Sequence, residues 1–271
     1  MIQDNLFNYK NFLYLRWSVC LVLVVSLAYA LDQPKIVANG GTWLGYTLGT
    51  IGAALIVWLI WFGVRKRQYA SNTGQLRGWV SAHVYLGLAL AVVGTLHTGF
   101  QIGWNVHSLA YVLMMATIVS GLWGLVLYVR YPREMSDTLN RKDPKAIVAD
   151  IETLDKEVQR LLKGRSEIVS NAVNQSTGQL IFNRLSERRS GVVKNCATEK
   201  TIELIEKELT RDDTLADLYK NQVERLKNLR QLRRYYKMRY WLDLWLAFHV
   251  PLSVGLLAAL TAHIVSVFYY W

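Results

Sequence analysis

The sequence predicts an all-α integral membrane protein with five membrane-spanning helices and a cytoplasmic helical hairpin. Of its 271 residues, 52% are apolar, and they come in long blocks with the charged residues between them. A bilayer core requires about 20 mostly apolar residues per helix, and five blocks reach or approach that length. This pattern excludes a disordered chain. Cys20 and Cys196 are too few and too differently placed for a disulfide framework or a metal–thiolate site.

The five blocks divide the chain into four parts. Residues 1–31 form an N-terminal anchor helix, 43–129 contain spans two to four, 130–240 form the cytoplasmic hairpin, and 241–271 form the fifth span. The first block ends in Ala28-Tyr29-Ala30, which is typical of a signal-peptide cleavage site, but we favour an uncleaved anchor. The expected spans are 12–31, 43–64, 79–102, 106–129 and 241–270.

Basic residues beside the spans predict the orientation of the chain, because cytoplasmic loops carry an excess of Lys and Arg. The opposite loops carry only Lys35 or no basic residue. We therefore expect the N-terminus and residues 130–240 in the cytoplasm, and Trp271 on the opposite side of a bacterial cytoplasmic (inner) membrane. The basic residues that give this orientation are Lys10, Arg16, Arg65, Lys66, Arg67, Arg77, Arg130 and Arg133.

Within the second span, small residues recur at every fourth position. Gly41, Gly45, Gly49 and Ala53 form this stripe. Small residues let a neighbouring backbone approach closely, so the stripe predicts tight helix packing. A close approach to a flat cofactor is the alternative.

The polar region between the fourth and fifth spans is predicted to be helical. Asp143-Pro144 is typical of a helix N-cap followed by proline at the first helical position. A second helix is expected from Thr210 into the last span, with a less regular tip at roughly 165–197. The region contains no histidine, phosphate loop or dinucleotide motif, so we expect no catalytic centre there. The first helix should bury Ile147, Ile151, Leu154, Val158 and Leu161, which alternate spacings of four and three.

The second hairpin helix ends in a basic stretch next to the membrane. Such a cluster most often contacts anionic lipid headgroups, with each basic residue contributing about 1 kcal/mol. Docking of an acidic partner is the alternative. The net charge of +11 thus reflects the orientation of the chain and its contact with the membrane surface. We expect no nucleic-acid partner. The stretch consists of Arg225, Lys227, Arg230, Arg233, Arg234, Lys237 and Arg239.

Four histidines form two pairs with identical spacing. His83 and His97 lie in the third span, and His249 and His263 lie in the fifth. Fourteen residues make close to four helical turns, so each pair lies on one helix face, about 21 Å apart. The fourth span returns the chain to the cytoplasm, so the third and fifth spans run parallel. His83 should therefore lie level with His249, and His97 level with His263.

Two imidazoles on facing helices could hold one metal ion between them. No carboxylate or thiolate lies at either level, so a zinc or non-haem iron site would lack ligands. A haem iron needs only axial ligands from the protein. Gly87 and Gly94 fall on the histidine face, where a bulky side chain would obstruct a macrocycle. The alternative is that the histidines only pack or hydrogen-bond between helices.

The segments RGWVSAHVYLGLALAVVGTLHTGF and FHVPLSVGLLAALTAHIVSVFYY resemble the haem-binding helices of di-haem membrane b-type cytochromes. That group includes respiratory cytochrome b and the ferric-reductase-like and cytochrome b561-like proteins. The resemblance covers the last four spans and implies that they form a haem-binding four-helix bundle. It implies two haem b groups, one held by His83 and His249 on the cytoplasmic side and one by His97 and His263 on the far side, with electrons passing between them.

The remaining candidate residues leave alternatives open. Arg77 and Arg130 could pair with haem propionates, or could reflect topology alone. His107 could be merely interfacial, a proton acceptor for quinol chemistry, or another ligand of the outer haem.

We expect an electron-transfer subunit of a membrane oxidoreductase complex, connecting quinol or a cytoplasmic donor with a redox partner on the opposite side. Since no flavin or nicotinamide domain is appended, a cytochrome c-type or iron–sulfur subunit would supply the other redox centre. The alternatives are a haem-free scaffold or signalling protein, and a cation transporter. No acidic residue lines the middle of any span, which disfavours the transporter.

Overall fold

The computed structural model describes residues 7–33, 38–68, 75–209 and 215–269. Within these ranges the chain forms nine α-helices and no strand, so the expected all-α class is confirmed. The chain divides into two compact units, one comprising Met1–Leu125 and Trp245–Trp271 and the other Val126–Leu244. The expected helix start at Thr210 and the C-terminal Trp271 lie outside the described residues.

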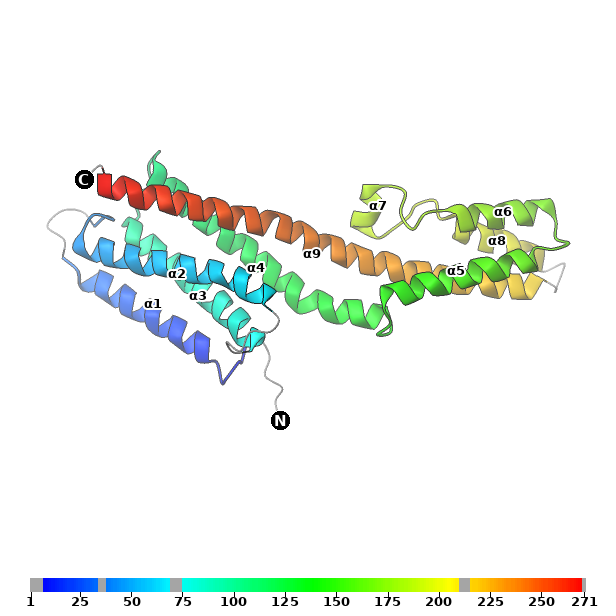
Figure 1. Cartoon of the computed structure of the whole chain (residues 1–271), viewed down its shortest axis with the longest axis horizontal. Coiled ribbons are helices and arrows are strands. Elements are labelled where there is room, and N and C mark those ends of the chain that lie inside the picture. Colours follow the sequence, from blue (N-terminus) through cyan, green and yellow to red (C-terminus); the bar gives the residue numbers. More distant parts are fainter. Residues whose placement is uncertain (1–6, 34–37, 69–74, 210–214, 270–271) are drawn as a thin grey trace. The chain divides into compact units, whose positions relative to one another are not determined.

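The first unit is built from helices that are long and apolar enough to cross a membrane. Among the described residues there are five such helices. Of α4 and α9, only the parts up to Leu125 and from Trp245 belong to this unit. In Figure 1, α1, α2 and α3 lie side by side in shades of blue. The five are α1 (Leu13–Leu31), α2 (Trp43–Arg67), α3 (Leu76–Thr98), α4 (Val106–Thr138) and α9 (Ala216–Tyr269).

Several helix ends differ from those expected from hydropathy. Helix α3 stops at Thr98 rather than 102, because Gly99 and Phe100 take left-handed backbone conformations with φ of 57° and 60°. Helix α4 continues to Thr138 through Pro132. Helix α9 is one helix of 54 residues, which joins the expected second hairpin helix to the fifth span. Hydropathy marks where a helix enters lipid and not where its backbone pattern begins.

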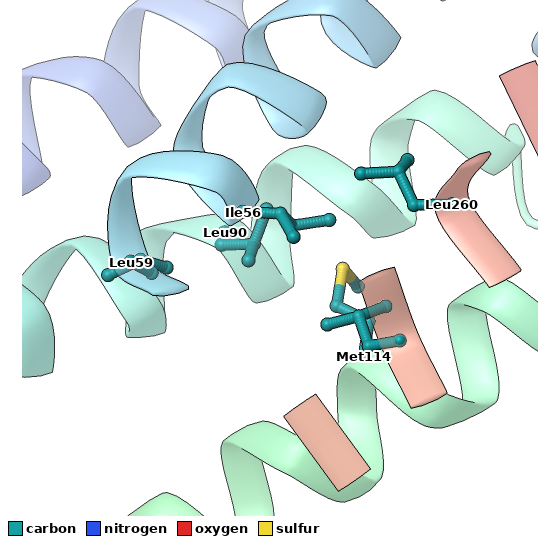
Figure 2. Packing of buried hydrophobic residues seen from close by; sticks show 6 residues of the cluster. Ile56, Leu59, Leu90, Met114 and Leu260 are labelled. Carbon is teal, nitrogen blue, oxygen red and sulfur yellow. The ribbon is translucent and has the colours of Figure 1, made fainter. Parts of the chain in front are cut away.

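Four helices of the first unit share an apolar core. Its buried residues are Ile56 and Leu59 from α2, Leu90 from α3, Met114 from α4, and Leu256 and Leu260 from α9. Figure 2 shows these side chains converging from the four helices. Helix α1 packs on α3, with Val25 buried against Leu48 and Val93.

The second unit contains α5 (Pro144–Leu161), α6 (Glu167–Gly178), α7 (Leu185–Ser190) and α8 (Ala197–Leu209), together with parts of α4 and α9. Asp143 caps α5 as expected, accepting a hydrogen bond of 2.7 Å from the Lys145 amide. Ile147 and Ile151 of α5 are buried against Leu229 and Leu232 of α9. The tip expected to be irregular, 165–197, contains α6 and α7, so this unit is more than a two-helix hairpin. Ser166 caps α6 through the Val169 amide.

Part of the basic stretch turns inward, which differs from the expected contact of the whole stretch with lipid. Arg225 is 2% exposed and donates to Asp155 at 2.6 Å and to Thr198 at 2.8 Å. Arg233 is also buried and donates to the Ile181 carbonyl and to the Cys196 sulfur. These two guanidinium groups hold the second unit together and are not available to headgroups.

Candidate functional site

The first unit contains two cavities, each lined by histidines from α3 and α9. His97 and His263 line a cavity of about 580 Å³, which His107 of α4 also borders. His83 and His249 line a smaller cavity of about 100 Å³. Equivalent histidines of the two helices share a cavity, so α3 and the last part of α9 run parallel. The structure therefore brings together the two members of each pair that the spacing indicated.

A buried apolar layer lies between the two cavities. Leu90 is seven residues from each histidine of α3, and Leu256 is seven residues from each histidine of α9. Both side chains are buried in the core shown in Figure 2. Seven residues correspond to about 10 Å along a helix. The layer therefore separates two polar levels within one apolar interior.

The His97 ring is fixed by helix α2. Its Nδ1 atom lies 2.8 Å from the backbone oxygen of Gly45, to which it donates in the tautomer that leaves Nε2 free. A Cβ atom at Gly49 would lie 2.7 Å from His97 Cε1, so no larger residue fits there without moving the ring. Histidines that bind metals usually donate their other ring N–H to a backbone carbonyl or carboxylate. His97 has this arrangement.

The His263 ring contacts two other histidines. Its Nδ1 atom is hydrogen-bonded to Nδ1 of His107, and the two ring centroids lie 4.6 Å apart. The centroids of His263 and His97 lie 5.9 Å apart, with the ring planes at 86°. His97 and His263 are the residues that would hold a metal-containing group in this cavity. His107 therefore lies in the same cavity as this pair, and its role stays a prediction.

The second pair is held less completely. His249 Nδ1 lies 2.8 Å from the Ser120 hydroxyl. The Trp245 indole donates to the Ser120 carbonyl at 2.9 Å and covers Gly124. His83 Nδ1 is buried and has no hydrogen-bond partner among the described residues. Both His83 and His249 thus face the small cavity, and only His249 has a close partner for Nδ1.

The cavity volumes test whether a macrocycle fits. Pockets for organic ligands typically measure about 300–1,000 Å³, so the larger cavity has room for one. The smaller cavity, at about 100 Å³, admits one only if apolar side chains such as Leu59 and Leu122 move apart. Gly87 lines the smaller cavity and faces open space, since a Cβ atom there would meet no atom within 4 Å. Gly94 lines the larger cavity, close to Met114.

The two arginines considered as propionate partners do not line either cavity. Arg77 is exposed in the first turn of α3. Arg130 is exposed and pairs with Glu134 at 2.7 Å within the second unit. Their pairing with haem propionates stays a prediction.

Sequence reasoning missed the residues that hold the imidazoles. The small-residue stripe of α2 was the one available signal, and Gly45 and Gly49 of that stripe contact His97. Ser120 carried no signal, because its partner His249 lies 129 residues away in the chain. In the part of the chain that the structure describes, no group of three or more His, Cys, Asp or Glu side chains is placed to hold a metal ion.

In comparisons with models of known protein families, with curated proteins and with solved structures, no match to this chain was found. The resemblance to di-haem membrane b-type cytochromes therefore stays a prediction from the sequence. The geometry of the histidines must carry the functional argument.

Proposed function

We propose that the chain is a di-haem b-type cytochrome subunit that carries electrons across a membrane. The observation that carries the proposal is the sharing of each cavity by equivalent histidines of α3 and α9. Three of these four histidines have Nδ1 within hydrogen-bond reach of another group, so that Nε2 would be free to hold an iron wherever Nδ1 carries the proton.

The chain's own residues would orient the ligands and keep the two sites apart. Gly45 and Ser120 hold the Nδ1 atoms of His97 and His249, and His107 holds His263. The layer around Leu90 and Leu256 separates the two sites with apolar side chains. A haem bound by two histidines exchanges single electrons as its iron changes between the ferrous and ferric states.

The same proposal includes an orientation and partners. The N-terminus and residues 130–240 face the cytoplasm of a bacterial inner membrane, and the chain end lies on the opposite side. This rests on the basic residues at the ends of the spans. The donor is quinol or a cytoplasmic redox protein, and the partner on the opposite side is a cytochrome c-type or iron–sulfur subunit.

Paired histidine substitutions test the assignment of ligands. His83→Ala and His249→Ala should each deplete the same haem, and His97→Ala and His263→Ala should deplete the other. Redox titration of the purified variants, followed by absorbance, distinguishes the two haems by their potentials. Loss of different haems from two members of one pair would contradict the pairing.

A second candidate is a haem-free scaffold whose second unit binds partners. The small volume beside His83 favours it. On this hypothesis, the native protein is colourless. His249→Asn would leave it folded and would not change its absorbance spectrum. The cytochrome hypothesis requires a loss of absorbance in the same variant.

A further inference from the structure

A short basic segment of the second unit exposes apolar side chains to the surroundings. We call residues 180–194, which include α7, the α7 segment. Leu180, Leu185 and Val192 are 69%, 68% and 62% exposed. Nothing in the described part of the second unit covers these three side chains, whereas the other apolar residues of the segment, Ile181, Phe182 and Val193, are half-buried or buried.

Basic residues surround these apolar side chains. The α7 segment contains four basic residues and one acidic residue. The acidic residue, Glu187, is used internally, since it accepts hydrogen bonds from the Asn183 and Arg184 amides at 2.8 and 3.2 Å. The exposed charge of the segment is therefore positive. Its basic members, all exposed, are Arg184, Arg188, Arg189 and Lys194.

Contacts with α9 fix the α7 segment beside the expected start of the fifth span. The Arg189 guanidinium lies over the Trp241 ring, 5.6 Å from its centroid. Gly191 packs against Lys237 so closely that a Cβ atom would lie 3.0 Å from its Cδ. The Phe182 and Tyr236 rings also meet, with centroids 6.5 Å apart. The segment is thus attached to residues 236–241 of α9, where an interfacial tryptophan is expected to mark the membrane surface.

We infer that the α7 segment docks on the anionic headgroup surface of the membrane. Exposed apolar residues flanked by Lys and Arg are the composition that lies in a membrane interface, with the apolar side chains in the acyl boundary and the charges at the headgroups. Continuity with Trp241 and the positive charge favour a lipid surface over a protein partner. This role belongs to the α7 segment and not to Arg225 and Arg233, which are buried. It does not depend on whether the histidines hold haem.

Spin labels on the full-length chain test the inference. Leu185→Cys and Ile168→Cys provide matched label sites, because both native side chains are about 70% exposed and Ile168 lies on α6, outside the α7 segment. Both variants are made in a Cys20→Ser background, since Cys20 is exposed and Cys196 is buried. The labelled chains are reconstituted in nanodiscs of phosphatidylcholine with or without phosphatidylglycerol.

For each label, we compare its accessibility to oxygen with its accessibility to a water-soluble nickel complex. This ratio should be several-fold higher for the label at 185 than for the label at 168. Adding phosphatidylglycerol should increase this difference, and Arg184→Gln with Arg188→Gln should reduce it. The control pair Lys156→Gln with Arg160→Gln, on α5, should leave it unchanged. Equal water accessibility at 185 and 168 in anionic nanodiscs would overturn the inference. Protection of the label at 185 in detergent without lipid would also overturn it, by pointing to a protein partner.

Discussion

At the scale of single residues, His107 is the side chain whose role the structure defines most clearly. The sequence left three roles open for it, and its hydrogen bond to His263 Nδ1 leads us to propose a fourth, that it positions that ring. A second histidine at this place holds the His263 ring in one orientation. Where His107 Nδ1 accepts, the proton of His263 is on Nδ1 and its Nε2 is free.

Replacing His107 should weaken one haem site without removing its ligands. Groups that orient a metal-binding histidine typically contribute about 10–100-fold in metal affinity, so His107→Ala should lower haem retention to that extent. His107→Gln should restore retention, because the amide oxygen can accept the His263 N–H. Haem content and the potential of the affected haem measure the effect. If His107 were itself a ligand, His107→Ala would abolish that haem and His263→Ala would spare it.

Gly87 offers a test of the smaller cavity. Its missing side chain leaves open space toward that cavity, so Gly87→Phe should fill the space and deplete the haem held by His83 and His249. Gly63→Phe is the control, since Gly63 also faces open space but is exposed and lines neither cavity. The haem-to-protein ratio should fall from two to one in the first variant only. A Gly87→Phe protein with both haems would contradict the assignment of this cavity.

At the scale of helices, the sequence and the structure agree where the information is local. The spacing of fourteen residues depends only on the helical period, so it predicts which histidines share a level. The Asp143 cap and the apolar face of α5 are local in the same way. Ser120 and Gly45 could not be identified as histidine partners, because those contacts depend on how helices pack. The short helices α6 and α7 lack the length at which a periodic pattern becomes distinct.

The attachment of α5 to α9 depends on an ion pair that is largely buried. Asp155→Ala would leave the Arg225 guanidinium without its carboxylate, which should cost about 3 kcal/mol. Amide hydrogen exchange of α5 in the intact protein should then be roughly 100-fold faster, if exchange follows local opening. Asp150→Ala is the matched control: it removes an exposed pair with Lys142 and should cost less than about 1 kcal/mol. Equal exchange rates in the two variants would show that the buried pair stabilises α5 no more than the exposed pair does.

At the scale of the whole molecule, the proposed orientation predicts which loops are reached from outside the cell. Single cysteines at Gln101 and Ser190, both exposed, report the loop after α3 and the second unit. In a Cys20→Ser background, a membrane-impermeant thiol reagent should label Gln101→Cys in intact cells and Ser190→Cys only after lysis. The opposite labelling pattern would reverse the proposed orientation. The site of His83 and His249 would then lie on the far side of the membrane, and the site of His97 and His263 on the cytoplasmic side.

The central claim is that four histidines hold two haems within one membrane chain. The most direct test is the absorbance spectrum of the purified full-length chain, oxidised and then reduced, with haem counted per polypeptide. The account predicts a red protein with a b-type reduced-minus-oxidised spectrum and two haems per chain. A single haem would confine binding to the larger cavity and contradict the second site. A folded and colourless protein would contradict the claim altogether.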